Sequence, residues 1–480
     1  MPNIGTMSFI RYKKFGNNEY AYEITAYWDP EQKKSRQIPK YLGVVVDKEA
    51  KIFVKKNTQK HDVEKLILDF GDAYILHEFL KKIKLYDILF KVFKDKTNYL
   101  LSIIYYRLCH PAAMNYAHIW FQGSFSRLLF KNIDLSSQRI SEFLEDIGNE
   151  KLQREYFEKH ISFVSQSKEG IIIDTTAMPN QIHFPFNEWG YNDGGIDKQI
   201  KLLFVIDRKS SLPVYFRYLP GNIVDVSSLS TTVEELKKFG VKSSFVLVDA
   251  GFFSEINIKG LYTENIEFLT RLPSKIKLYK DLVKQEVQDI ETFKNAVKYG
   301  KRALFVKQKK IDLYGKEVYA YIIQDPERKG QETKKLLINA LDENETDEDS
   351  VKYELLKSGL FILISSFEIE KKDVVSFYYL RLIVEKLIGF AKDDLNLLPL
   401  RSHQEQTMRG YLLLIFIVLT TFALLKEKLG NEYTVEEILM TMRNLKCKVY
   451  DNEIIIQELA KQQKEIIEKL DILVPKKSGI

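Results

Sequence analysis

Three acidic residues stand where carboxylates from separate segments can meet. Asp174 ends the apolar run GIIID, Asp249 ends the run SFVLVD, and Glu385 follows much later in a predicted helix. Sheets of α/β proteins carry functional groups at the carboxyl ends of their strands, and carboxylate oxygens are the ligands that Mg²⁺ and Mn²⁺ prefer. We therefore expect Asp174, Asp249 and Glu385 to form a metal site for Mg²⁺ or Mn²⁺.

Such a site suits chemistry on phosphodiesters. Two ions about 4 Å apart can activate a nucleophile, stabilise a leaving oxygen and clamp an in-line phosphoryl transfer. One carboxylate has to bridge the two ions while the others hold each ion from outside, so three acids are the minimum. The sequence therefore predicts two bound ions.

Four polar residues lie in a predicted helix over residues 374–392: Tyr378, Arg381, Glu385 and Lys392. At about 100° per residue, they fall within an arc of about 60° and form a stripe on an otherwise apolar helix. Taken alone, the stripe is typical of a solvated face with an Arg381–Glu385 pair worth a few tenths of a kcal/mol. Next to the two aspartates, it predicts a DNA-binding set in which Tyr378, Arg381 and Lys392 grip the phosphate backbone.

The same four residues have the spacing Y-x2-R-x3-E-x6-K, in YYLRLIVEKLIGFAK. With this signature behind two strand-ending aspartates, the sequence resembles the bacterial insertion-sequence transposases of the DDE type. The resemblance covers roughly residues 165–425 and includes the segments IIIDTTAMPN, YLPGNIVD, LVDAGFF and LNLLPLRSHQEQTMRGYLLL. It implies that Asp174, Asp249 and Glu385 are the catalytic DDE triad.

The resemblance also implies an activity. Such an enzyme binds the ends of its own mobile element, cuts the flanking phosphodiester with metal-activated water, and uses the freed 3′ hydroxyl to attack target DNA. Two alternatives are a nuclease that only hydrolyses and a DNA-binding repressor that has lost catalysis, although the intact acids argue against the repressor. Because two ends are joined to one target, we expect a homodimer on double-stranded DNA.

Residues 170–272 predict the fold class. Strands and helices follow the order βββαβαβ: strands 170–174, 198–208 and 212–219, helix 224–239, strand 244–249, helix 256–263 and strand 267–272. This is the element order of a ribonuclease H-like sheet. We therefore predict an α/β protein whose ribonuclease H-like catalytic domain, with a mixed sheet, is interrupted by a mostly β insertion.

Changes of periodicity predict five segments: an N-terminal β meander at 1–60, a helical DNA-binding region at 61–165, the catalytic domain at 166–273 and 359–430, the inserted mostly β module at 274–358, and a C-terminal helical tail at 431–480. The insertion is predicted from the strand-prone pieces RALFVKQKK, EVYAYIIQ and KKLLINAL. Basic and aromatic residues of the meander could contact nucleic acid, but a hairpin cap with a solvated face fits the pattern equally well. A Ser-capped helix at 135–144 could enter a major groove or be an ordinary surface helix.

Two further segments carry open alternatives. Arg401 follows the signature helix and is expected to extend the DNA-binding surface together with His403 and Arg409, with ordinary solvated charges as the alternative. The segment 454–473 has apolar residues near heptad spacing, so it either pairs with its copy or packs back on its own domain.

Composition limits the other functions. The formal net charge is +6, which is compatible with a polyanionic partner. The two cysteines, Cys109 and Cys447, form no CxxC pair, which argues against a zinc site of the usual spacing and is typical of a reducing cytoplasm. The apolar run at 411–425 is short of the roughly 18 to 20 residues that span a bilayer, and no secretory signal opens the sequence. We therefore expect a cytoplasmic protein with no membrane partner.

Overall fold

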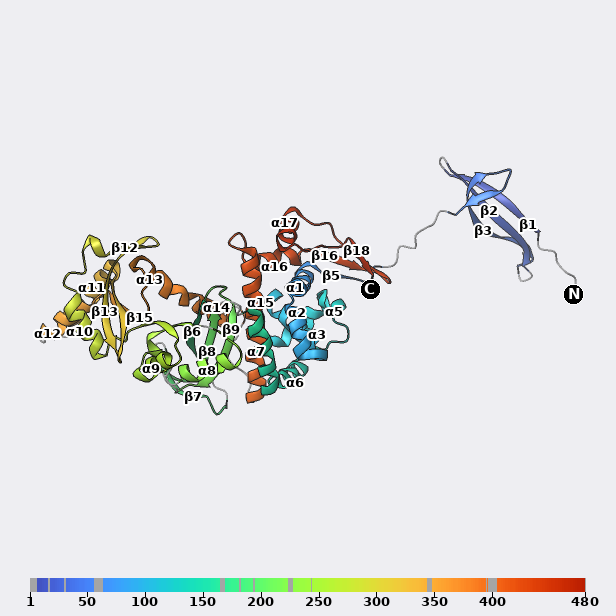
Figure 1. Ribbon diagram of the computed structural model, residues 1–480. Helices are drawn as coiled ribbons and strands as arrows, with labels where there is room; N and C mark the ends of the chain where they lie inside the picture. Colours follow the sequence, from blue (N-terminus) through green and yellow to red (C-terminus); the bar gives the residue numbers. More distant parts are fainter. Residues whose placement is uncertain are drawn as a thin grey trace. The chain divides into compact units, whose positions relative to one another are not determined.

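Figure 1 shows the computed structural model, which describes residues 7–15, 18–29, 32–55, 64–164, 169–180, 183–192, 195–222, 228–242, 244–342, 348–393, 395 and 404–479. The chain divides into two compact units, Met1–Lys65 and Leu66–Ile480. Each unit has a fold of its own.

The first unit is one antiparallel sheet with the strand order β1-β2-β3-β4. The strands are β1 (Met7–Phe15), β2 (Asn18–Asp29), β3 (Lys34–Asp47) and β4 (Ile52–Val54). Their many aromatic and β-branched residues favour extended backbone. Among the described residues of this unit, Ala21 and Ile24 are the only buried apolar side chains. No second layer of the unit itself therefore covers the described sheet.

The second unit begins with β5 (Leu66–Asp69) and a bundle of helices. The helices are α1 (Gly71–Lys82), α2 (Leu85–Phe93), α3 (Thr97–Cys109), α4 (Ala117–Gly123), α5 (Ser126–Leu129), α6 (Ser137–Ile147) and α7 (Glu150–Val164). They pack with α15 (Glu405–Leu429), which comes from far along the chain and contacts α3 and α6 (Figure 1).

The helix α15 is long and apolar enough to cross a membrane by length and composition alone. However, 78% of its most apolar window is buried inside the unit. It therefore has the environment of a core helix.

A ten-stranded mixed sheet follows, in the order β12-β13-β14-β15-β11-β10-β6-β8-β7, with β9 pairing to β8. Its first six strands are β6 (Ile171–Pro179), β7 (Glu188–Asn192), β8 (Gly195–Asp207), β9 (Pro213–Pro220), β10 (Phe245–Val248) and β11 (Glu267–Arg271). The connecting helices are α8 (Leu229–Lys238) and α9 (Glu255–Thr263). The predicted mixed α/β fold is confirmed. The additional strand β7 was not predicted, because its short sequence, EWGYN, contains Gly190 and leads into a glycine-rich segment typical of a turn.

The prediction of a mostly β module at 274–358 is wrong. The segment contains α10 (Lys277–Glu286), β12 (Ala296–Tyr299), β13 (Arg302–Leu313), β14 (Lys316–Gln324), α11 (Pro326–Asp342) and α12 (Glu348–Lys357). The piece KKLLINAL is helical in α11 because Leu, Lys and Ala all have high helix propensity. The three strands extend the main sheet through β15 (Leu360–Ser365), which pairs with both β14 and β11.

The prediction of a helical tail at 431–480 is also wrong. The tail contains α16 (Val435–Arg443), β16 (Lys446–Val449), β17 (Glu453–Ile456), α17 (Lys461–Leu470) and β18 (Lys477–Gly479). Its strands join β5 in a sheet with the order β18-β17-β16-β5. The heptad interpretation of residues 454–473 fails because the segment starts as a strand, and α17 packs on α15 and α16 of its own unit.

Candidate active site

The strand register brings Asp174 and Asp249 side by side. β6 and β10 are parallel neighbours in which Ile171 pairs with Val246. Three residues further along, the same register sets Asp174 opposite Asp249, and neighbouring strands lie about 4.8 Å apart. The apolar residues before each aspartate are buried, so burial of these runs in the sheet fixes where both carboxylates emerge.

The third carboxylate comes from a broken helix that contacts β6. The single helix predicted over 374–392 is instead α13 (Lys371–Tyr378), a 3-10 turn η6 (Tyr379–Arg381) and α14 (Leu382–Asp393). In the turn, the ring of Tyr379 stacks on Tyr299 of β12 with 5.4 Å between centroids. This contact comes from another part of the chain, so the helical periodicity does not reveal the break.

One guanidinium joins the three carboxylates. Arg381 Nη1 lies 2.7 Å from Asp249 Oδ1, and Arg381 Nη2 lies 3.3 Å from Asp174 Oδ2 and 2.8 Å from Glu385 Oε1. Only 16% of the Arg381 side chain is exposed. The Arg381–Glu385 pair of the solvated-face alternative is present, and 47% of the Glu385 side chain is exposed. However, Tyr378 is buried and Arg381 is largely covered, so the stripe as a whole is not a solvated face.

Tyr378 supports this cluster from below the surface. Its hydroxyl donates to Asp249 Oδ1 at 2.7 Å and accepts from Arg381 Nη1 at 3.1 Å. Burial, with the neighbouring Asp249 charge, raises the pKa of Tyr378, so its hydroxyl remains protonated. The side chain is 2% exposed, so in this structure it cannot make the phosphate contact that the sequence predicts.

Burial also dominates the electrostatics of Asp174. It raises the pKa of this carboxyl to about 6; the Arg381 charge opposes the rise, while Asp249 and Glu385 add to it. Burial by itself lowers the pKa of the Arg381 guanidinium, but Asp174, Tyr378 and Asp249 raise it by more. Arg381 is therefore a permanent positive charge in the cluster.

Lys392 of α14 contacts the strand that carries Asp174. Its ammonium donates to Thr176 Oγ1 at 2.7 Å and to the Ala177 carbonyl at 2.8 Å, both on β6. Thr176 was not predicted as a site residue from the sequence. Its signal is the spacing of two residues from Asp174, which puts both side chains on one face of the strand.

The sequence that forms this site matches a known protein family. Residues 165–421, more than half of the chain, match the Transposase DDE domain family. The chain belongs to this family of DDE transposases. The match includes all three acids and the four signature residues. It confirms the predicted DNA transposase, an enzyme that cuts DNA and transfers strands.

Solved structures give a weaker likeness. One is described as "Cryo-EM structure of piggyBac transposase synaptic complex with hairpin DNA (SNHP)". It shares 12% sequence identity with this transposase, with a TM-score of 0.39, over 78% of this chain and 69% of that one. The comparison with curated proteins gives no match.

DDE transposases use divalent metal ions, and the donors here fit that chemistry. Asp174, Asp249 and Glu385 offer hard oxygens that all reach one positive centre. In the part of the chain that the structure describes, however, no three Asp, Glu, His or Cys side chains are grouped to hold a metal ion directly. The guanidinium of Arg381 occupies the meeting point instead. Its Nε is buried without a hydrogen-bond partner, so this polar cluster is not fully satisfied.

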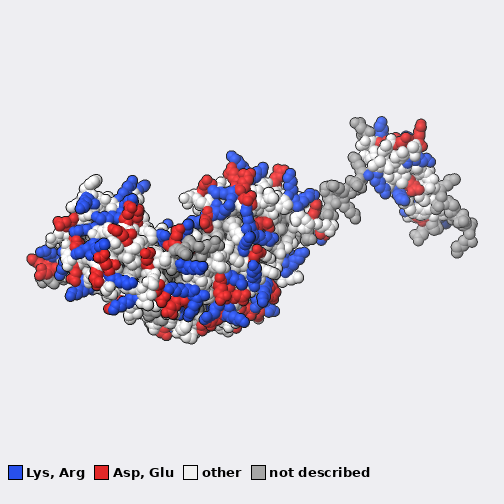
Figure 2. Space-filling model, in the orientation of Figure 1, with Lys and Arg blue, Asp and Glu red and all other residues white. Residues whose placement is uncertain are grey.

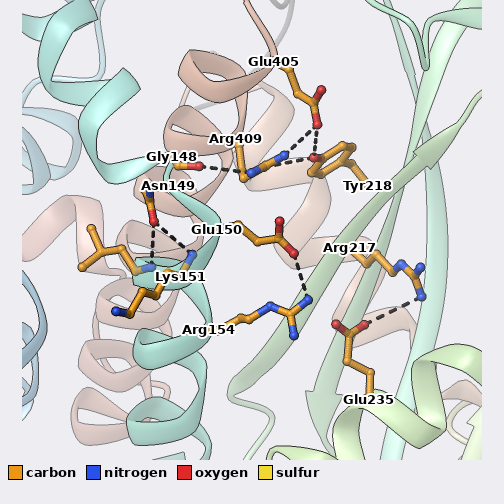
Figure 3. A network of polar contacts seen from close by, with 11 residues as sticks. Gly148, Asn149, Glu150, Lys151, Arg154, Arg217, Tyr218, Glu235, Glu405 and Arg409 are labelled. Carbon is orange, nitrogen blue, oxygen red and sulfur yellow. Dashed lines mark hydrogen bonds and ion pairs between the residues drawn. The ribbon is translucent and has the colours of Figure 1, made fainter.

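Of the three residues predicted to extend the DNA-binding surface after the signature helix, the structure describes only Arg409. Arg401 and His403 lie outside the described residues. Arg409 is held inside the transposase: it donates to Tyr218 Oη at 3.1 Å, to Glu405 Oε1 at 2.6 Å and to the Gly148 carbonyl at 3.5 Å (Figure 3). Arg409 therefore ties α15 to β9 and to the α6–α7 turn, and it is neither the predicted phosphate contact nor an ordinary solvated charge.

Proposed function

We propose that the transposase cuts DNA at the ends of its mobile element and joins the freed 3′ hydroxyl to target DNA at one site formed by Asp174, Asp249 and Glu385. The observation that carries this proposal is the convergence of the three carboxylates on Arg381, each within 3.3 Å. Three acids from two strands and a helix are held at one point although their charges repel. A purely structural ion pair needs only one of them.

The sheet supports a ribonuclease H-like catalytic core. The strands β9, β8, β6, β10 and β11 are consecutive neighbours, with antiparallel pairing up to β6 and parallel pairing beyond it. In this arrangement the first two acids emerge from the central strands. The proposal therefore assigns catalysis to 166–273 and 359–430.

The residues of the chain have separate roles in the proposal. Asp174, Asp249 and Glu385 would hold Mg²⁺ or Mn²⁺. The first prediction tests whether two ions bind. When bound, such ions activate water or a 3′ hydroxyl and stabilise the leaving oxygen. Arg381 and Lys392 provide positive charge for the phosphate beside the scissile bond. Tyr378 is a positioning residue, since its hydroxyl orients the Asp249 carboxylate.

The reaction requires two element ends to be held together. A single triad treats one end in a fixed geometry, so we propose a homodimer on double-stranded DNA with two-fold symmetry. We also propose that the enzyme acts in the cytoplasm, because its substrate is DNA. Arg401 remains a proposed contact to the DNA backbone.

The first prediction tests the triad. Asp174→Asn, Asp249→Asn and Glu385→Gln preserve side-chain shape but remove the charge that binds a divalent cation. In a cleavage assay with Mg²⁺ and element-end DNA, each variant should lose cleavage by orders of magnitude while retaining end binding in a gel-shift assay. Titration of Mn²⁺ by electron paramagnetic resonance should show two bound ions in the wild type and fewer in each variant.

Matched controls separate the alternatives. Asp207→Asn changes the aspartate that ends β8, where it pairs with Ile171 at the start of β6 and not with the cluster, and should leave cleavage intact. Cleavage without strand joining would favour the nuclease. End binding without cleavage in the wild type would favour the repressor. Full cleavage by any triad variant would exclude that residue from the site.

A further inference from the structure

The first unit carries most of the net charge. Residues 1–65 contain 13 Lys and Arg against 8 Asp and Glu, a net of +5, whereas the rest of the chain contains 59 against 58. On the face drawn in Figure 2, positive and negative side chains are interspersed over the second unit. Attraction for a polyanion is therefore concentrated in the small sheet.

Strand pairing divides this sheet into two unlike faces. Paired residues of neighbouring strands point to the same side, so Lys13 with Tyr20 and Tyr22 with Tyr41 define one side. By the same alternation this side carries six aromatic rings, and we call it the aromatic face: Phe9, Phe15, Tyr20, Tyr22, Trp28 and Tyr41.

Four rings of the aromatic face, those of Phe15, Tyr20, Tyr41 and Tyr22, form a connected row. Centroid distances are 5.9 Å for Phe15–Tyr20, 6.3 Å for Tyr20–Tyr41 and 5.4 Å for Tyr22–Tyr41. Phe9, Phe15 and Trp28 are 45%, 60% and 51% exposed. An exposed cluster of this kind is typical of an interaction site, since isolated domains rarely leave one uncovered.

Two cations lie beside these rings, and no acidic residue accompanies them on the described strands of this face. The ammonium of Lys13 lies 5.6 Å from the centroid of Tyr22, and the guanidinium of Arg11 lies 5.4 Å from that of Phe9. Neither cation forms an ion pair with a described residue, and the β1–β3 positions of this face hold no Asp or Glu.

The acids lie on the opposite face, where cations neutralise them. Glu19 pairs with Lys48 at 2.8 Å, Glu23 with Lys40 at 3.8 Å, and Asp29 with Arg36 at 3.1 Å. The charges of Arg11 and Lys13 are thus not neutralised by acids on the side that carries the exposed rings.

We propose that the aromatic face binds single-stranded DNA, with unpaired bases stacked on the exposed rings and phosphates beside Arg11 and Lys13. Aromatic platforms interleaved with cations are the usual means of binding unpaired strands, and a duplex hides the base faces that stack. Two protein occupants of the aromatic face fit its charge less well. Pairing with the first unit of another copy of the chain would bring two net charges of +5 together, and the second unit, with a net charge near zero, offers no comparable negative charge.

The test uses the full-length protein without divalent ions. Fluorescence anisotropy would measure binding to a labelled oligothymidine of about 15 nucleotides, a length within reach of known single-strand sites, and to a duplex of the same length. We expect tighter binding to the single strand. Phe15→Ala and Trp28→Ala should each weaken it by about 5- to 100-fold. Tyr27→Ala, an exposed tyrosine on the opposite face, should leave it unchanged.

Two lysine variants keep the proposal testable if the ring variants misfold. Lys13→Glu should weaken binding and reduce its salt dependence, because it removes a phosphate contact, whereas Lys14→Glu on the opposite face should do so much less. Equal losses in the two lysine variants, a preference for the duplex, or a change of oligomeric state in Trp28→Ala would each overturn the proposal. Asp174→Asn should bind the single strand like the wild type, which keeps this test separate from that of the catalytic site.

Discussion

Arg381 determines the electrostatic balance of the candidate active site. Three carboxylates approach one guanidinium, and only 9% of the Asp174 side chain is exposed. Without a cation between them, these acids would repel one another, most strongly at Asp174, where burial lowers the local dielectric. In the metal-free protein, Arg381 therefore neutralises these carboxylates as a bound divalent cation would. We expect that a divalent cation can replace Arg381 in this role.

The second prediction follows from this substitution. Arg381→Ala should lower the free energy of unfolding by about 3 kcal/mol in the presence of EDTA, since it leaves the buried Asp174 without its partner. Mg²⁺ should then raise the unfolding temperature more in the variant than in the wild type, because only the folded state assembles the acids. Differential scanning calorimetry with and without Mg²⁺ measures both effects.

Arg154→Ala is the matched control. Arg154 also forms an i,i+4 pair, with Glu150 at 2.8 Å, but both side chains are well exposed. Its replacement should change neither the unfolding temperature nor the response to Mg²⁺. An equal Mg²⁺ response in wild type and Arg381→Ala would contradict the substitution of one charge by the other.

At the scale of elements, the contact of α6 with α15 depends on two glycines. A Cβ at Gly410 of α15 would lie 1.8 Å from the Leu144 carbonyl oxygen, and one at Gly148 would lie 1.8 Å from the Gln406 carbonyl oxygen. No Cβ fits at such distances, so the backbones approach as closely as they do because both positions lack a side chain.

The third prediction uses this close approach. Gly410→Ala should lower the free energy of unfolding by about 3 kcal/mol, because the backbones have to move apart and the packing around them is lost. Gly330→Ala in α11 is the control, since open space surrounds its position and alanine favours a helix. Urea unfolding of the two variants gives the comparison. A Gly410→Ala protein as stable as Gly330→Ala would show that the helices do not need the contact.

The fourth prediction concerns the contact of α7 with β9. His160 is fully buried; its Nε2 lies 2.8 Å from the Pro213 carbonyl oxygen and its Nδ1 lies 3.2 Å from Tyr156 Oη. Burial lowers the pKa of His160 to about 4. The unfolded chain therefore takes up a proton near pH 6.5 that the folded chain refuses until about pH 4. Stability should fall by up to about 3 kcal/mol as the pH drops through this window.

His160→Gln isolates this effect, because glutamine can still donate to Pro213 but does not titrate. Unfolding by urea at a series of pH values should give a shallower loss of stability below pH 6.5 for the variant than for the wild type. His77 is also buried and contributes equally to both proteins. Parallel curves would mean that His160 is protonated without cost in the folded state.

At the scale of the whole molecule, the end of the chain is part of the second unit's framework. β16 pairs with β5, so Lys446 lies beside Asp69 and Val449 beside Leu66. Ile466 and Leu470 of α17 are fully buried. The tail therefore cannot be removed as an independent dimerisation arm.

The fifth prediction addresses the dimer. Light scattering of the complex with element-end DNA should give two chains and two ends per particle. Deleting residues 452–480 should lower thermal stability, because β16 loses one of its two partner strands, β17, and the faces of α15 and α16 that α17 covers are exposed. Leu473→Ser, at a side chain that is 90% exposed, should leave both stability and stoichiometry unchanged. One chain with one end in the active particle would refute the dimer.

What the sequence determined by itself is local or carried by spacing. Apolar runs ending in Asp174 and Asp249 predict strands whose acids emerge at one sheet edge, since strand patterns depend on adjacent residues. The signature spacing identifies Arg381 and Glu385, because helical periodicity fixes which residues share a face. The family match agrees with the transposase predicted from these residues.

Only the tertiary structure decided which groups meet across long stretches of chain. The pairing of β5 with β16, the 3-10 turn at Arg381 and the internal network of Arg409 each depend on partners distant in sequence. Local patterns do not encode such partners, because contact energies between distant residues appear only once the chain has folded around them. For the same reason the periodicity of residues 374–392 predicted a solvated or DNA-facing stripe, whereas packing against β6 buries Tyr378, covers most of Arg381 and leaves Glu385 exposed.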